Sequence, residues 1–257
     1  MGAMASYLYC AVKGATTSRR GLGSKAPKGL AGTGAPRLVD VGGGWSVIVA
    51  DAPLSLYDAG AIDAKLRDID WVGARAGEHE AVVEHALGLG TVVPMKLFTL
   101  FSTEERAKAH VAKMKRALDK AAAVIEGCEE WSLRVLLDEK RARAKAPAAK
   151  KVTSGTSFLA RKKALEDERR SAGARGAAEA DALFAALAKI AKKAERRPPP
   201  NRDLAARVFL DAAFLVPRGA VKKLQDAVGK AAKTLVPDGF DLTLSGPWPA
   251  YSFIPAS

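Results

Sequence analysis

Apolar residues recur at helical spacing through the middle of the chain. Six of them follow one another at intervals of four, three, four, three and four residues, so they share one face of a helix whose other face carries lysine and arginine. These residues are Ala107, Val111, Met114, Leu118, Ala121 and Ile125. Ser102 followed by Glu105 predicts a capping box at the start of the helix, and Gly127 predicts its end. The pattern therefore predicts one continuous amphipathic helix.

Shorter apolar runs, separated by turn-forming residues, precede this helix. They predict strands at 7–12, 37–41, 45–50 and 91–100, the last interrupted by Pro94. Gly42-Gly43-Gly44 joins the second and third strands as a hairpin, which ends at Pro53. Helical spacing over 58–70 and 71–89, with a stop at Gly90, predicts two helices between the hairpin and the last strand. This part of the chain therefore reads as mixed α and β structure.

The second half combines strands with a long run of helix-forming residues. Strands are predicted at 131–137, 207–216 and 240–244, and a helix at 219–235. Residues 139–197 are predicted to be helical, with a break around Thr153–Thr156. The second half of that segment has an apolar stripe of Ala180, Leu183, Leu187 and Ile190. Pro198-Pro199-Pro200 ends the segment.

The order of these elements predicts an α+β protein of two domains. Residues 1–127 form the first domain and 128–257 the second, which contains the helical segment 139–197 and a strand-helix-strand unit over 203–257. The chain has 257 residues, enough for two ordinary domains. No apolar run approaches the roughly eighteen residues of a membrane helix, so no membrane association through a spanning segment is expected.

Positive charge is concentrated in one segment. The net charge is +13, and residues 139–197 hold 17 basic and 7 acidic residues, a net charge of +10. Such a surface attracts nucleic acid non-specifically, or it forms the solvated face of a helix. A nucleic-acid-binding protein acting through 139–197 is therefore one functional hypothesis. However, Phe158 and Phe184 are the only aromatic residues between Arg141 and Arg197. Aromatic side chains that could stack on bases are therefore sparse in this segment.

Candidate catalytic and metal-binding residues do not form a recognisable set. His79 and His85 are six residues apart, about 240° around a helix, and cannot share one metal ion. Cys10 and Cys128 make no zinc pattern and are expected to be free thiols. No catalytic residue, metal site or cofactor is predicted, and no small-molecule substrate is expected.

The last stretch of the chain carries aromatic residues on a proline-rich corner. The apolar run from Leu242 enters Gly246-Pro247-Trp248-Pro249 and continues through Tyr251 and Phe253. Large aromatic residues are uncommon in frayed segments. The corner is therefore expected to be docked, either onto a partner or, more simply, into the protein's own core by closing the last strand onto the core of the second domain.

Four segments, in this order, resemble the gas vesicle protein F/L family, and together they span nearly the whole chain. They are Tyr7-Leu8-Tyr9; Trp71 with 78–83 and 90–101; 130–135 with 158–163; and 211–216 with 244–253. The Gly246-Pro247-Trp248-Pro249 corner is the sharpest part of the match. The chain departs from the family pattern where Lys96 replaces Arg, Phe98 replaces Gly and Asp211 replaces Asn. Because lysine lacks the bidentate fork of arginine, a salt bridge of Lys96 to Glu78 or Glu80 would be weaker.

The resemblance implies a non-enzymatic accessory or structural protein of gas vesicles, located in the vesicle or the cytoplasm of a prokaryote. It implies a ferredoxin-like N-terminal domain, a C-terminal domain with a helical, coiled-coil-like hairpin, and partners that include the small hydrophobic shell protein and other accessory proteins. The candidate partner-binding residues are Arg161, Lys162, Lys163, Arg169 and Arg170. The motif residues expected to be structural are Glu78, His79, Glu80, Pro94, Lys96, Gly246, Pro247, Trp248, Pro249, Tyr251 and Phe253.

Overall fold

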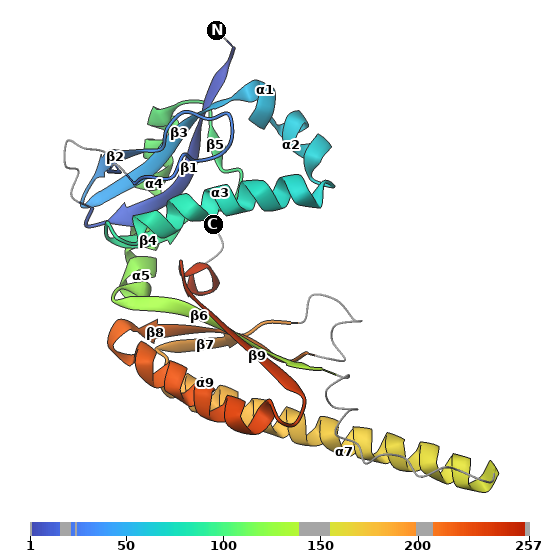
Figure 1. Cartoon of the computed structure of the whole chain (residues 1–257). Helices are drawn as coiled ribbons and strands as arrows, with labels where there is room; N and C mark the ends of the chain where they lie inside the picture. The colour runs from blue at the N-terminus through green and yellow to red at the C-terminus, as the bar shows by residue number, and fades with distance from the viewer. Residues whose placement is uncertain (1, 16–21, 24, 139–154, 199–207, 255–257) are drawn as a thin grey trace. The chain divides into compact units, whose positions relative to one another are not determined.

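The structure is a computed structural model that describes residues 2–15, 22–23, 25–138, 155–198 and 208–254. The first part of the predicted basic helical segment, the first half of the break predicted at Thr153–Thr156 and most of the triple-proline break lie outside these residues. Gly155 and Thr156, the second half of that break, are helical. The chain divides into two compact units, Met1–Gly127 with Trp248–Ser257 and Cys128–Pro247 (Figure 1). Each contains one antiparallel sheet and helices, which confirms the predicted α+β class.

The first unit is built on the sheet order β2-β3-β1-β4, with β5 paired to β1. The strands are β1 (Met4–Lys13), β2 (Arg37–Gly42), β3 (Trp45–Pro53), β4 (Thr91–Pro94) and β5 (Leu100–Phe101). The helices are α1 (Leu54–Tyr57), α2 (Ala59–Lys65), α3 (Ile69–Ala86), α4 (Glu104–Lys113) and α5 (Lys115–Ile125). Tyr7, Tyr9 and Ile48 of the sheet pack with Val82 and Val83 of α3 in one buried core.

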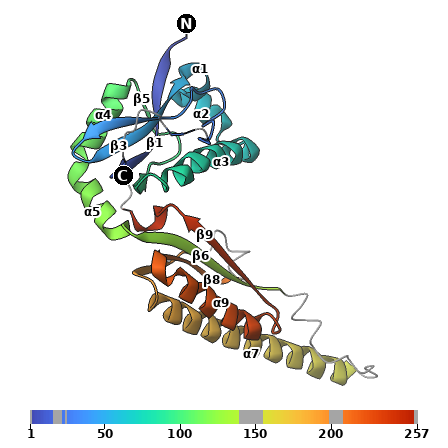
Figure 2. The same cartoon turned by 60° about the vertical axis from the view of Figure 1, so that its left-hand side comes forward.

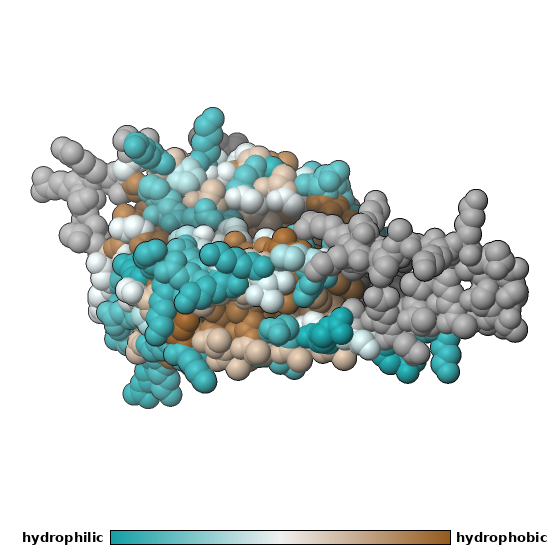
Figure 3. Space-filling view, turned by 60° about the horizontal axis from the view of Figure 1, so that its bottom comes forward, coloured by the Kyte–Doolittle hydropathy of each residue, from teal (hydrophilic) through white to brown (hydrophobic). Residues whose placement is uncertain are grey.

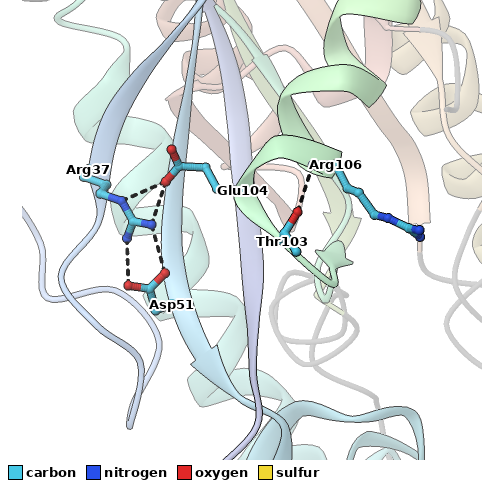
Figure 4. Close-up of polar contacts among 5 residues, drawn as sticks. All are labelled: Arg37, Asp51, Thr103, Glu104 and Arg106. Atoms are coloured by element: carbon cyan, nitrogen blue, oxygen red, sulfur yellow. Dashed lines mark hydrogen bonds and ion pairs between the residues drawn. The ribbon is translucent and has the colours of Figure 1, made fainter.

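The predicted helix after β5 differs from the structure at its start and in its middle. Thr103, not Ser102, is the N-cap: its hydroxyl accepts a hydrogen bond from the Arg106 backbone N–H (3.2 Å; Figure 4). Met114 leaves the helical conformation (φ −84°, ψ 1°) and divides the element into α4 and α5. Five of the six apolar residues of this face are nevertheless buried, and Met114 is partly buried, because the periodicity of side chains survives a one-residue break.

An ion-pair cluster ties α4 to the hairpin of the first unit. Arg37 of β2 donates to both carboxylate oxygens of Asp51 on β3 (2.9 and 3.1 Å). The same guanidinium donates twice to Glu104 at the first turn of α4 (2.7 and 3.0 Å; Figure 4). These partners hold the start of α4 against the sheet.

The second unit is built on the sheet order β7-β8-β6-β9. Its elements are β6 (Cys128–Leu137), α7 (Gly155–Ala188), β7 (Lys193–Arg196), β8 (Val208–Pro217), the 3-10 turn η1 (Arg218–Ala220), α9 (Val221–Leu235) and β9 (Phe240–Trp248). Figures 1 and 2 show α7 and α9 side by side on one face of this sheet. They pack on Leu133, Phe214 and Phe240.

The order of the described elements in the second unit, β-α-β-β-α-β, is that of the ferredoxin-like motif, which the family resemblance predicts for the N-terminal domain. The first unit has the same pattern of strand neighbours but places its helices differently. The short strand β7 lies inside the segment predicted to be helical. Its sequence Lys-Ala-Glu-Arg has no apolar alternation, so only its pairing with β8 identifies it as a strand.

Candidate functional site

Three consecutive residues of α3 hold three separate segments of the first unit. Glu78, His79 and Glu80 contact the 29–33 loop, strand β1 and the C-terminal segment, respectively. Asp68 caps this helix through the Trp71 backbone N–H (3.0 Å), which fixes where its turns fall. We call Glu78, His79 and Glu80 the α3 hub.

His79 is buried among tyrosines. The Tyr7 hydroxyl accepts a hydrogen bond from the Phe98 backbone N–H (3.1 Å) and shares a second hydrogen bond with His79 Nδ1 (2.8 Å). The tautomer of the imidazole determines which of these two groups donates. The other ring nitrogen, Nε2, is buried and has no hydrogen-bond partner among the described residues. The ring also stacks on Tyr9 (5.5 Å between centroids). Burial lowers the pKa of His79 to about 4.

Glu78 fixes the 29–33 loop. The Ala31 N–H donates to one carboxylate oxygen (2.9 Å), and Arg75 donates to the other (2.7 Å). The Tyr9 hydroxyl accepts the Leu30 N–H of the same loop (3.0 Å). Gly29 has φ +78°, and a Cβ there would lie 2.6 Å from the Tyr9 hydroxyl oxygen, so only glycine fits. The loop is thus closed against α3 by hydrogen bonds from two elements.

Glu80 receives the C-terminal aromatic segment. The Tyr251 hydroxyl donates to Glu80 Oε2 (2.8 Å), and burial together with the Glu80 carboxylate raises the pKa of Tyr251. Tyr251 lies in the 3-10 turn η2 (Tyr251–Phe253), which belongs to the first unit. The expectation of docking onto the second domain is therefore wrong for the aromatic turn, because the hydrogen-bonding partner of Tyr251 is on α3. The last strand itself does pair within the sheet of the second unit.

Replacing Tyr251 with phenylalanine is expected to destabilise the protein by about 1 kcal/mol, because the hydroxyl and its partially exposed partner form one charge-assisted hydrogen bond. Urea unfolding measures this change. Glu80→Ala and the double variant complete a mutant cycle, in which the coupling energy isolates the Tyr251–Glu80 pair from the other contacts of Glu80. Additive effects of the two substitutions would contradict the assigned pair.

The corner between β4 and β5 contains the departures at Lys96 and Phe98. Phe98 has a left-handed backbone (φ +65°), which explains why the family pattern has glycine there. Its ring stacks on Trp71 (5.5 Å, 16° between planes), and this contact offsets part of the backbone strain. Pro94 is buried opposite Cys10 of β1, whereas Lys96 is exposed.

The Gly-Pro-Trp-Pro corner begins in the second unit. Gly246 has φ +143°, and a Cβ there would lie 2.8 Å from the Glu130 carbonyl oxygen and 3.0 Å from the Trp131 ring. The Gly246–Pro247 peptide bond is cis. Glycine is therefore required both by its backbone angle and by its close approach to β6. Pro249 is buried, while Trp248 is 36% exposed.

Asp211, the third departure, is a buried carboxylate held by two arginines. Arg134, opposite it on β6, donates twice to Oδ2 (2.8 and 3.0 Å). Arg197 donates to Oδ1 (3.0 Å). Asp211 is 6% exposed, so the two guanidinium groups compensate its lost hydration. Aspartate in place of asparagine is thus matched by local positive charge.

The five candidate partner-binding residues all lie on α7. Lys163 and Arg170 are exposed, and the side chains of Arg161, Lys162 and Arg169 lie outside the described set. The same unit has a second basic face, which the charge pattern of residues 139–197 does not predict. It is formed by the exposed α9 residues Lys222, Lys223, Lys230 and Lys233.

The surface on this side of the second unit is not uniformly charged. Figure 3, viewed toward α7 and α9, shows hydrophilic side chains around a band of apolar surface. The exposed residues of α7 beyond Arg170 are largely alanine: Ala174, Ala177, Ala178, Ala182, Ala185 and Ala186. The other exposed residues of this stretch include Arg175, Glu179 and Asp181, so the face offers a partner apolar contact bordered by charges of both signs.

Three observations bear on other possible functions, namely nucleic-acid binding, metal binding and membrane insertion. Phe184, one of the two aromatic residues in the basic segment, lies under the Arg196 guanidinium (4.5 Å) and packs on Phe214, so its ring is occupied. Within the described ranges, no three His, Cys, Asp or Glu side chains gather as a metal site would require. In the same ranges, no helix combines the length and apolar character needed to cross a membrane.

Comparisons with known proteins identify the family of the chain. Residues 5–255 match the family model of the gas vesicle synthesis protein GvpL/GvpF. Gas vesicle protein L of Streptomyces sp. (strain CB03234) is 26% identical over 235 residues, covering 88% of this chain and 86% of that protein.

Two crystal structures share the fold. Gas vesicle protein GvpF from Anabaena sp. PCC7120 gives a TM-score of 0.68 at 16% identity, over 99% of this chain and 97% of that one. GvpF from Microcystis aeruginosa gives 0.64 at 15% identity, over 97% and 98% of the two chains. The chain therefore belongs to the gas vesicle synthesis protein GvpL/GvpF family.

Proposed function

We propose that this protein is a non-enzymatic accessory protein of gas vesicle assembly that binds the small hydrophobic shell protein and other accessory proteins. The family match over residues 5–255 is the observation that carries the proposal. The protein would act in the cytoplasm of a prokaryote or on the growing vesicle. Its action is binding without turnover, and it needs no cofactor.

The binding surface we propose is the outer side of α7. Its exposed alanines allow close approach of an apolar helix, and its exposed cations Lys163 and Arg170 attract acidic groups at the edge of that helix. Residues Cys128–Pro247 hold 25 basic and 15 acidic residues, so +10 of the net charge of +13 lies in this unit. An acidic and apolar partner surface complements both properties.

The test is co-purification of the shell protein with the tagged full-length chain. Charge reversal of Arg161, Lys162 and Lys163 to glutamate is expected to abolish capture, because it replaces attraction by repulsion at the proposed surface. The matched control reverses Lys222, Lys223 and Lys230 on α9, which changes the net charge equally and should leave capture intact.

Three outcomes separate the parts of the proposal. Undiminished capture by the α7 variant would reject the α7 surface but not the shell-protein partner. Equal loss in both variants would show that only overall charge matters. Absence of capture by the unaltered chain would reject the shell protein as a direct partner.

A further inference from the structure

Helix α9 carries the largest positive charge of the helices that the structure describes. Its 15 residues contain four lysines and one aspartate, a net charge of +3. The longer helix α7, with 34 residues, contains six basic and five acidic residues, a net charge of only +1. Of the two helices that cover the sheet of the second unit, α9 is therefore the one with a strong excess of one sign.

The four lysines share one face of α9. All of them are exposed, and we call them the α9 stripe: Lys222, Lys223, Lys230 and Lys233. At about 100° per residue they fall within an arc of about 100°, and they extend over about 17 Å along the helix. The buried residues of the helix, Leu224, Val228 and Leu235, fall on the opposite side. The stripe therefore faces away from the core along its whole length.

The stability of α9 does not explain this arrangement. Asp226 pairs with Lys222 one turn earlier (3.4 Å), but the other three lysines have no ion-pair partner among the residues that the structure describes. Lys222 and Lys223 lie in the first turn, where the helix dipole disfavours cations. Lys230 and Lys233 are three residues apart, a spacing at which like charges repel. A solvated helix face normally mixes both signs, so this face indicates a partner that supplies negative charge.

The composition of α9 favours carboxylates as the source of that charge. The other exposed residues of the helix are polar or glycine, so they offer no apolar contact: Gln225, Asp226, Gly229 and Thr234. The helix contains no arginine to fork a phosphate and no aromatic residue to stack on a base. Lysine ammonium groups act as point charges, which can pair with single carboxylates. The stripe therefore complements an acidic, polar segment of another protein.

We propose that the α9 stripe binds an acidic segment of a partner protein, at a surface separate from the one proposed on α7. The exposed alanines of α7 are bordered by charges of both signs, whereas the α9 stripe has charges of one sign and no apolar border. The two surfaces therefore select partner segments of different chemistry. The assignment of the α9 stripe does not depend on binding of the shell protein.

The test is the affinity of the full-length chain for labelled acidic peptides, measured by fluorescence anisotropy at about 150 mM salt, where distant charges are screened. Two helical peptides of about 15 residues, long enough to span the stripe, have the same composition. One carries its glutamates on a single face, and the other carries them all around the helix. The first is expected to bind more tightly, because its carboxylates match the stripe.

Substitution of the three unpaired lysines tests which residues hold the peptide. Together, Lys223→Glu, Lys230→Glu and Lys233→Glu should weaken binding of the one-faced peptide at least about tenfold, because three attractions become repulsions. Glutamine at the same positions should weaken binding less, because it removes attraction without adding repulsion. Equal thermal unfolding of these exposed variants would show that they act on binding and not on folding.

The charge-reversed α7 variant, with glutamate at residues 161–163, is the matched control, because it changes the net charge equally and should keep its affinity for the peptide. The α9 variant should in turn still capture the shell protein, so either proposal can fail without the other. The assignment would be overturned if the unaltered chain did not bind the peptide, if the α9 variant bound it equally well, or if both variants lost affinity equally. Loss of affinity for a DNA strand of similar length, without loss for the peptide, would reassign the stripe to nucleic acid.

Discussion

Replacing Gly176 with alanine is expected to destabilise the protein by about 2 kcal/mol, although alanine is the better helix former. A Cβ at this position would overlap Cζ of Phe240 and lie 2.7 Å from its Cε1. Phe240 is 4% exposed and makes an edge-to-face contact with Phe209 (5.2 Å), so the ring cannot move aside without disturbing the core. The cost of this overlap outweighs the gain of about 1 kcal/mol in helix propensity.

Gly173 provides the control on the same helix. A Cβ there meets nothing within 4 Å, so Gly173→Ala should stabilise the protein by up to about 1 kcal/mol. The same substitution one turn apart is therefore expected to change the free energy of unfolding in opposite directions, which denaturant unfolding of the two variants measures. Stabilisation by Gly176→Ala would show that α7 does not pack closely on β9 at this point.

Acid is expected to destabilise the protein through His79. The folded pKa of about 4 lies below the usual histidine pKa of 6.5, so between these pH values the unfolded chain takes up a proton that the folded protein excludes. The contribution of His79 is complete above pH 6.5 and falls as the pH decreases. The loss reaches about 2 kcal/mol at pH 4.5 and about 3 kcal/mol below pH 4.

His79→Gln isolates this effect from the other titrating groups. The variant should be less stable at pH 7, because it loses the ring contact with Tyr9, but its stability should fall less between pH 7 and pH 4.5. Urea unfolding at several pH values measures these slopes. Equal slopes for the unaltered protein and His79→Gln would contradict a buried neutral histidine.

Periodicity predicted the elements whose apolar residues face the interior. The face from Ala107 to Ile125 is buried, and the hairpin around Gly42–Gly44 forms as expected. The N-cap at Thr103 was missed because Ser102 offers the same hydroxyl one residue earlier. Strand β7 was not predicted because lysine, alanine, glutamate and arginine favour a helix locally. It forms a strand because it pairs with β8, and this pairing is not visible in the local sequence of β7.

The contacts of the α3 hub could not be predicted from the sequence. The resemblance predicts that Glu78, His79 and Glu80 are structural residues, but it does not predict that each of them contacts a different segment. Their partners lie from 47 to 171 residues away in the sequence. Such pairings follow from the packing of α3 on the sheet, which no local pattern reveals. Phe98 was noticed only as a departure, and its left-handed backbone explains why glycine is expected there.

The contact between Tyr251 and Glu80 also has a consequence for the order of events during synthesis. The two residues are 171 positions apart, and the whole of the second unit is made between the two parts of the first. The entropy cost of closing a loop grows with its length, so this contact is among the last to form. Every nascent chain therefore passes through a stage in which the first unit has been synthesised up to Gly127 but Tyr251 has not. At this stage Glu80 on α3 lacks its hydrogen bond from Tyr251. A chaperone or partner that recognises this face of α3 would distinguish unfinished chains from finished ones.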